Sequence, residues 1–199
     1  MATGFGLRLV GRVGGGAARI REYFVPSTDS TALFEGDVVK LPDTTGAMDA
    51  DGRKTVITRA VAGDATKVGV VVGFRPDGTL PLTGQYRAAS TARYVQVCDD
   101  PNAIYEVQED AVGGSVTAAL IGAMSNADII VASGSTTTGF SGTMLDSNTA
   151  GASAADLKIL GVSQTITTPA NVAALSGGAV LLVRILSAES SLIATDSQL

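Results

Sequence analysis

The chain contains no histidine and no tryptophan, and cysteine occurs once in 199 residues. The absence of histidine excludes Ser–His–Asp and Cys–His catalysis in their common forms, and it removes the most frequent transition-metal ligand. A single cysteine excludes an intramolecular disulfide and leaves no ligand set for zinc. We therefore expect a chain that is made and kept in a reducing cytoplasm, with no cofactor and no metal.

Charge is also scarce, because only 17% of the residues are charged and the mean hydropathy is +0.30. The net charge of −5 comes from 14 basic and 19 acidic residues, without the clusters of lysine and arginine that nucleic acids or anionic membranes attract. We expect no direct nucleic-acid partner. A surface with so few charges is either buried in an assembly or covered by Thr, Ser and Gly, and both suit a component of a larger object.

Long hydrophobic runs are missing as well. The first residues, MATGFGLRLVGRVGGG, lack the apolar run of a signal peptide. The most apolar stretch, AVLLVRIL (179–186), is far too short to span a membrane and contains Arg184. The sequence therefore predicts no export signal, no membrane-spanning segment and no membrane partner.

The common nucleotide-binding and hydrolase motifs are absent too. The glycines at 14–16 are followed by AARI, without the lysine of a phosphate-binding loop, and neither GxGxxG nor GxSxG occurs in its required context. Only carboxylate chemistry remains, and its best candidate is the acidic stretch 92–110 around Cys98. Strand alternation places Glu106 and Glu109 on opposite faces, so they would not act on one substrate together. We do not expect an enzyme.

The middle of that stretch, DDPN (99–102), has a simpler interpretation than an ion site. A calcium loop needs a glycine at its sharp turn and a bidentate glutamate, whereas this segment has Pro101 and no glycine. Asp, Pro and Asn are the residues that form tight turns. We predict a β-hairpin of strands 93–98 and 103–109 joined by this turn. Cys98 is then a small buried hydrophobe, since no neighbouring cation would activate its thiol.

Short β-branched runs separated by Gly, Asp, Pro and Asn recur along the chain. They predict an all-β fold, a β-sandwich or barrel that is jelly-roll-like with long loops. The run 67–74 is apolar on both faces and indicates a central strand covered on both sides, with Gly69 and Gly73 marking bulges or close backbone approach. Only 115–124 and 169–175 could form helical turns. The other expected strands are 36–41, 54–61, 93–98, 103–109, 127–132, 156–166 and 179–186.

The first 22 residues differ from the rest, because they combine four arginines with many glycines that disfavour a helix. We expect an extended N-terminal arm over 1–22 and a β-rich domain over 23–199, with a possible subdivision near 111–126. A frayed terminus is the alternative. An arm laid on a neighbouring subunit would be anchored by its apolar residues, Leu9 included, with its arginines on acidic surface. The candidate contacts are Phe5, Leu7, Arg8, Arg12, Arg19 and Arg21.

The Ser/Thr/Gly-rich segment 132–151 is typical of a surface loop or an edge strand, and it could serve as a contact loop.

Several segments in this order resemble the capsid decoration, or cement, proteins of tailed double-stranded-DNA bacteriophages. They are YFVPSTDSTALFEGDVVKL (23–41), VGVVVGF (68–74), YRAASTARYVQVCDDPNAIYEVQED (86–110), ADIIVASGSTTTGFSGTMLDSNTA (127–150) and LKILGVSQ (157–164). The stretch TITTPANVAALSGGAV departs from the family pattern. The resemblance implies a β-rich protein of the virion that binds the outer surface of the major capsid protein lattice. It further implies self-association into dimers or trimers, and it brings no catalytic residue.

Other functions stay open at this point. The chain could be another virion structural protein, such as a head fibre base, a tail component or a minor capsid component. A carbohydrate-binding β-sandwich is disfavoured by the 5% aromatic content and the absence of tryptophan. An Asp/Glu-only hydrolase would need two facing carboxylates in one cleft.

Overall fold

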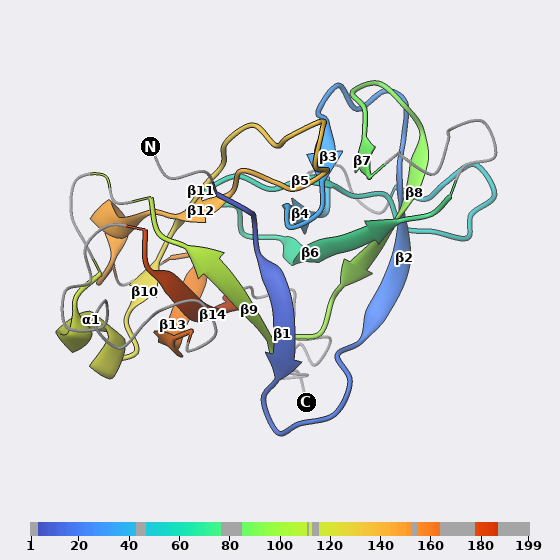
Figure 1. Cartoon of the computed structure of the whole chain (residues 1–199). Helices are drawn as coiled ribbons and strands as arrows, with labels where there is room; N and C mark the ends of the chain where they lie inside the picture. The colour runs from blue at the N-terminus through green and yellow to red at the C-terminus, as the bar shows by residue number, and fades with distance from the viewer. Residues whose placement is uncertain are drawn as a thin grey trace.

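The computed structural model describes residues 4–42, 47–76, 85–110, 112, 116–152, 155–163 and 178–186, and it consists mainly of two five-stranded antiparallel sheets (Figure 1). Neither sheet closes on itself, so the all-β, sandwich-like prediction is confirmed and the fold is not a closed barrel. Sheet I has the order β1 (Arg8–Arg12), β9 (Ala103–Gln108), β14 (Val180–Ile185), β13 (Leu157–Val162) and β10 (Asn126–Ala127). Sheet II has the order β2 (Ile20–Val25), β8 (Arg93–Cys98), β6 (Lys67–Phe74), β4 (Val38–Lys40) and β5 (Thr58–Arg59).

Shorter elements complete the described part of the chain. Two two-stranded sheets pair β3 (Leu33–Phe34) with β7 (Tyr86–Arg87) and β11 (Ile129–Ile130) with β12 (Met144–Leu145). The helix α1 (Ala118–Gly122) confirms the predicted helical turns near 115–124, and the Thr117 hydroxyl caps it by accepting from the N–H of Leu120. A single 3-10 turn, η1 (Ser147–Thr149), follows β12. The other predicted helical turn, 169–175, lies outside the described residues.

Strand β6 lies at the centre of sheet II and is covered on both faces, as its sequence predicts. Val70 packs into the main core, which draws apolar side chains from both sheets, whereas Val71 packs into a second core on the other face of sheet II. A Cβ at Gly69 would lie 2.0 Å from the carbonyl oxygen of Cys98, so this glycine permits a close backbone approach. Gly73 lies at a register shift opposite Gln96, which confirms the predicted bulge.

The acidic stretch does not form the predicted hairpin. Strands β8 and β9 have the predicted positions, but β8 pairs with β2 and β6 in sheet II while β9 pairs with β1 and β14 in sheet I. The turn at 99–102 therefore carries the chain from one sheet to the other. Local sequence could specify a strand, a turn and a strand, whereas the choice of partner depended on strands distant in sequence.

The N-terminal segment also differs from its prediction. Instead of extending as a separate arm, residues 8–12 and 20–25 form edge strands of sheets I and II. Leu7 is only 2% exposed, because it packs into the main core. The described part of the segment 1–22 thus belongs to the β-rich domain.

A buried ion pair joins the two sheets. The Lys67 ammonium, at the start of β6, lies 2.6 Å from the carboxylate of Asp156, which immediately precedes β13. Both side chains are 2% exposed. The Asp156 carboxylate also accepts hydrogen bonds from the backbone N–H groups of Gly63 (3.1 Å) and Ile129 (3.1 Å). These bonds offset the cost of burying its charge.

We expect Asp156→Asn to lower the free energy of unfolding by roughly 3–5 kcal/mol, because it removes a counter-charge from a buried ammonium. Urea denaturation measures the effect. The matched control is Glu22→Gln, which disrupts a partly exposed pairing with Lys54 and should cost about 1 kcal/mol or less. Equal costs for the two variants would contradict the role given to the buried pair.

We expect Gly69→Ala to destabilise the protein by about 2–3 kcal/mol or more, because the added methyl group collides with backbone rather than with a movable side chain. Gly11→Ala is the control, since a Cβ there meets nothing within 4 Å. Thermal unfolding of both variants tests the close approach of β6 and β8. A Gly69→Ala protein as stable as Gly11→Ala would show that the two strands lie further apart.

Candidate interaction site

The arginines of the N-terminal segment contact the acidic turn of their own chain. Arg12 Nε donates to Asp100 Oδ2 at 2.8 Å, and Arg19 Nε donates to Asp99 Oδ1 at 2.7 Å. Arg21 Nε lies 3.6 Å from Asp99 Oδ2. The acidic surface that was expected on a neighbouring subunit is therefore supplied within the same molecule.

Further bonds fasten the connection between β1 and β2 to this turn. The N–H of Val13 donates to the carbonyl of Asn102 at 2.8 Å, and the Tyr23 hydroxyl donates to Asp99 Oδ2 at 2.8 Å. Burial, followed by the bond to Asp99, raises the pKa of Tyr23 well above its ordinary value. These contacts assign a structural role to the carboxylates of the turn. Among the described residues, no group of three or more His, Cys, Asp or Glu side chains is placed to hold a metal ion.

The other carboxylates of the acidic stretch have separate partners. Glu106 pairs with Arg8 and accepts a hydrogen bond from the Ser163 hydroxyl, while Glu109 accepts from the N–H of Val116 at 3.0 Å. Cys98 is completely buried, and burial raises the pKa of its thiol, which disfavours the reactive thiolate. The predicted separation of the two glutamates and the packing role of Cys98 are both confirmed.

Three of the predicted contact residues converge on a small apolar pocket. Phe5, Leu7 and Arg8 line it together with residues of β6 and the turn before β4, and its volume is about 210 Å³. The Arg8 guanidinium lies 5.6 Å from the centre of the Phe5 ring. Phe140 closes another side of the pocket and is 48% exposed. The apolar pocket is thus defined by the following lining residues: Phe5, Leu7, Arg8, Leu9, Glu35, Gly36, Val71, Val72 and Phe140.

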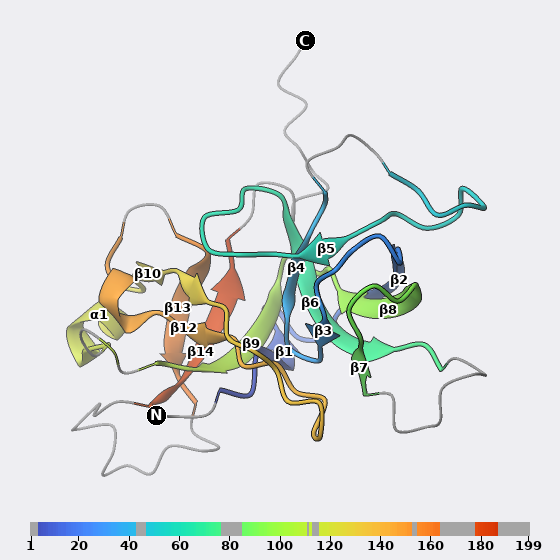
Figure 2. The ribbon, with the colours of Figure 1, turned by 90° about the horizontal axis from the view of Figure 1, so that it is seen from above.

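Phe140 belongs to the Ser/Thr/Gly-rich segment, which projects from the body of the molecule between β11 and β12 (Figure 2). The base of this loop is anchored by buried polar contacts. The Asp37 carboxylate accepts hydrogen bonds from the hydroxyls of Ser141 and Thr143, and burial raises the pKa of Asp37. Backbone bonds connect Glu35 with the residues on either side of Phe140, since its N–H donates to the Gly139 carbonyl and its carbonyl accepts from the N–H of Ser141. Phe140 therefore occupies a defined position beside the apolar pocket.

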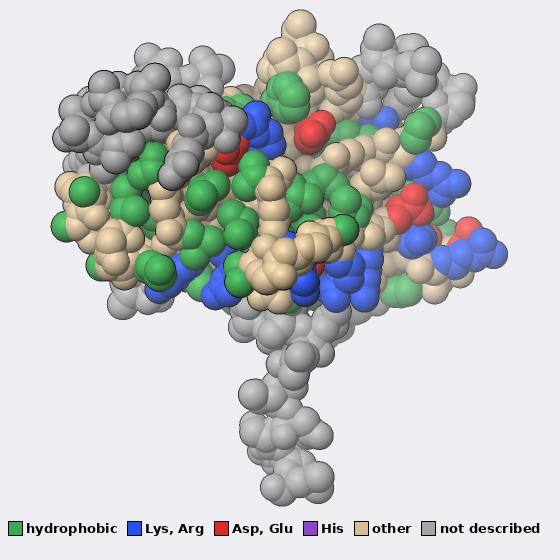
Figure 3. Space-filling model, turned by 60° about the horizontal axis from the view of Figure 1, so that its bottom comes forward, with side chains coloured by type: hydrophobic (Ala, Val, Ile, Leu, Met, Phe, Trp, Pro, Cys, Tyr) green, Lys and Arg blue, Asp and Glu red, His purple; other side chains and the backbone are tan. Residues whose placement is uncertain are grey.

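Strands β1 and β2 and the connection between them add exposed apolar side chains. Val10, Val13 and Ile20 are each between 46% and 49% exposed. Figure 3, in which the bottom of the molecule comes forward, shows hydrophobic side chains gathered on one face with basic side chains among them. Apolar side chains that remain exposed together are typical of a surface that a partner covers.

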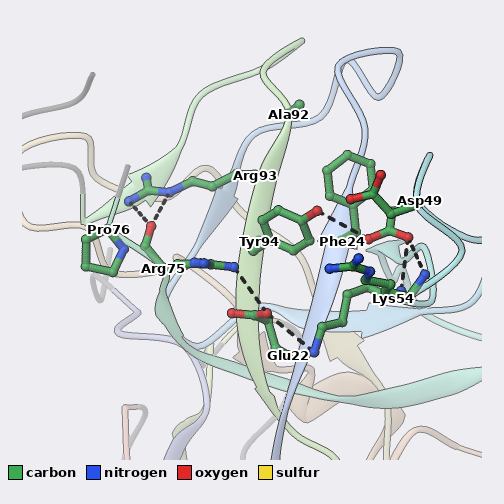
Figure 4. Close-up of a pocket in the computed structure, with 11 residues that line it drawn as sticks. Glu22, Phe24, Asp49, Lys54, Arg75, Pro76, Ala92, Arg93 and Tyr94 are labelled. Carbon is green, nitrogen blue, oxygen red and sulfur yellow. Dashed lines mark hydrogen bonds and ion pairs between the residues drawn. The ribbon is translucent and has the colours of Figure 1, made fainter. Parts of the chain in front are cut away.

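A larger and more polar groove lies on sheet II, with a volume of about 570 Å³ (Figure 4). Its floor includes the rings of Phe24 on β2 and Tyr94 on β8, whose centres are 5.1 Å apart. The turn at 49–54 forms one wall, and Arg75 with Pro76 contributes to the other.

The charged side chains of this groove are held by defined contacts. Burial alone would raise the pKa of Asp49, but hydrogen bonds from the N–H groups of Arg53 and Lys54 and from the Tyr94 hydroxyl outweigh it and leave the pKa below its ordinary value. The sequence did not predict a binding site at any of these residues. The available signal was strand alternation, which turns Tyr94 away from the face on which Arg93 and Val95 are buried.

Comparisons with protein families, with curated proteins and with solved structures give no match. Across the described ranges, no helix has the length and apolar character needed to cross a membrane.

The acidic turn should make stability depend on pH. Burial alone would raise the pKa of Asp100, but the N–H groups of Asn102 and Arg19 and the guanidinium of Arg12 lower it below 3.8. The ionised carboxylate therefore stabilises the fold above about pH 4, and this contribution is lost as the pH falls through the folded-state pKa. We expect the wild-type free energy of unfolding to fall more steeply between about pH 5 and pH 3 than that of Asp100→Asn.

Urea denaturation across this pH range gives the two slopes. The exposed Asp51→Asn serves as the control and should keep the wild-type slope. If Asp100→Asn also keeps that slope, the turn does not anchor the β1–β2 connection in the way described.

Proposed function

We propose that this chain is a capsid decoration protein of a tailed double-stranded-DNA bacteriophage. It would bind the outer surface of the major capsid protein lattice, associate with further copies of itself, and stabilise the head against the pressure of packaged DNA. The resemblance of the segments between 23 and 164 supports this proposal. The structural observation that carries it is the apolar pocket beside Phe140, on a loop whose base is anchored.

The size of the apolar pocket favours a protein partner. Small-molecule sites usually measure about 300–1,000 Å³, whereas this pocket of about 210 Å³ suits a single large side chain. Aromatic residues, Phe included, are enriched in protein interfaces, so an exposed phenylalanine next to such a pocket suits a protein contact. Arg8 and Glu35 add charge to the lining, as expected where an apolar centre meets a polar rim.

The proposed activity needs only modest contacts. A standard protein interface buries roughly 1,600 Å² in total, and the symmetry of a capsid repeats each contact many times. Each added interface must be broken before the shell opens. Many weak contacts would then protect the head together.

The test uses heads that lack this protein, purified from the phage that encodes the chain. We expect the added protein to bind these heads by co-sedimentation and to raise the temperature at which they release DNA. Phe140→Ala should weaken binding at least tenfold, because the exposed ring is lost from the contact. Val61→Ala removes a similarly exposed apolar side chain (51%) from a different surface and should bind as the wild type does.

Binding that leaves the temperature of DNA release unchanged would overturn the stabilising role. Failure to bind heads, together with density for the protein on the tail of the virion, would favour the alternative of another virion structural component. Equal effects of Phe140→Ala and Val61→Ala would remove the apolar pocket from the contact surface.

A further inference from the structure

We propose that the groove over Phe24 and Tyr94 binds an acidic saccharide, a sugar ring that carries a carboxylate, sulfate or phosphate group. This site is separate from the proposed capsid contact and does not depend on it. The volume of about 570 Å³ lies within the range of small-ligand sites and is sufficient for one or two sugar rings.

The floor of the groove provides apolar support for a ring. The rings of Phe24 and Tyr94 are half-buried, 5.1 Å apart and inclined by 47° to each other. Aromatic faces of this kind offer a large apolar contact to the C–H face of a sugar while leaving its hydroxyls available for hydrogen bonds. The chain has few aromatic residues, but the fold places two of them side by side here.

The wall at 49–54 is fixed before any ligand arrives. Asp49 accepts hydrogen bonds from the N–H groups of Arg53 (2.6 Å) and Lys54 (3.1 Å), and from the Tyr94 hydroxyl (3.2 Å). The same carboxylate therefore orients both the wall and the ring in the floor. A preorganised site loses less conformational entropy when it binds.

The cations of the groove favour an anionic ligand. Arg75 and Lys54 reach the Glu22 carboxylate from opposite sides, at 3.6 Å and 3.4 Å (Figure 4). These distances exceed those of good charge-assisted hydrogen bonds, so a ligand anion could accept shorter bonds from either side chain. The Arg75 guanidinium also lies 5.3 Å from the centre of the Tyr94 ring, which places positive charge beside the apolar floor.

The charged side chains that line the groove also favour an anionic ligand. Four basic and three acidic side chains line the groove, although the whole chain has a net charge of −5. One of the three acids, Asp49, already accepts hydrogen bonds from the N–H groups of Arg53 and Lys54 and from the Tyr94 hydroxyl. A neutral sugar would make no use of the cations Arg75 and Lys54, and an acidic peptide would make little use of the aromatic floor. A ring with an attached anion uses both.

Isothermal titration calorimetry with the full chain tests the site. The probes are a tetramer of galacturonic acid, a sulfated chondroitin tetrasaccharide, the neutral maltotetraose and a short polyglutamate peptide. We expect at least one acidic saccharide to bind at least tenfold more tightly than maltotetraose and polyglutamate. The chondroitin tetrasaccharide carries both carboxylates and sulfates, so tighter binding of it than of the galacturonate tetramer would assign a contribution to the sulfate groups.

Two variants localise the binding. Arg75→Gln should weaken it at least tenfold, and this side chain is 58% exposed, so its replacement does not threaten the fold. Tyr94→Leu should weaken it similarly, with circular dichroism as the check on folding. Arg184→Gln changes a cation on sheet I and should bind as the wild type does.

Any of four results would overturn the inference: no binding of either acidic saccharide, equal binding of maltotetraose, equal or tighter binding of polyglutamate, or an unchanged affinity in Arg75→Gln. Because the titration contains no capsids, its failure leaves the proposed capsid function unaffected. Failure of the capsid-binding test would likewise leave the proposed saccharide site unaffected.

Discussion

The buried ion pair between Lys67 and Asp156 is the constraint on which the arrangement of the two sheets depends. It joins the first residue of β6 to the residue before β13, and the same carboxylate accepts the N–H groups of Gly63 and Ile129. One acidic group thereby sets the positions of four segments of the chain. Two charges buried in this way are tolerated only while every bond is made, so the pair favours a single relative placement of the sheets. The apolar pocket depends on that placement, because its lining comes from β1 of sheet I and β6 of sheet II, whereas the groove lies on sheet II alone.

The chain has few charged residues, and some of these few are buried inside the fold. Several charged side chains lie in the interior, where each orders a stretch of backbone. Arg87, which is fully buried, donates to the carbonyls of Pro26, Asp29 and Thr31 and holds the loop before β3 in place. A chain with few charges that places many of them inside has few left for its surface. That surface suits contact with other proteins better than free diffusion, which is consistent with the proposed place in a virion. Among the residues that the structure describes, the buried charged side chains are Asp37, Asp49, Lys67, Arg87, Arg93, Asp99, Glu106, Glu109, Asp110 and Asp156.

The apolar pocket and the polar groove use different parts of sheet II and different chemistry. The pocket lies between β6, the start of β1 and Phe140, and it offers an apolar contact of the size of one side chain. The groove lies over β2 and β8, and it combines an aromatic floor with opposed cations. One protein could therefore bind a capsid through the first surface and leave the second facing outward. In both, polar bonds beneath the surface, at Asp37 and at Asp49, hold the exposed residues in position.

The sequence by itself determined the positions of several strands, β6, β8, β9, β13 and β14 among them, whereas β1, β2, β3, β7 and β12 were not predicted. The positions of β6 and β8 were predicted to the residue, and Val95 and Val97 are buried while Gln96 is exposed, because side-chain alternation is a local property of the backbone. Only the tertiary structure decided which strands pair. The acidic turn connects two sheets instead of closing a hairpin, and the arginine-rich N-terminal segment binds that turn instead of extending from the domain. The groove could not be predicted, since its floor and walls come from positions up to 72 residues apart, such as Glu22 and Tyr94. Contacts between residues so distant in sequence depend on the packing of the whole chain, and no local pattern encodes them.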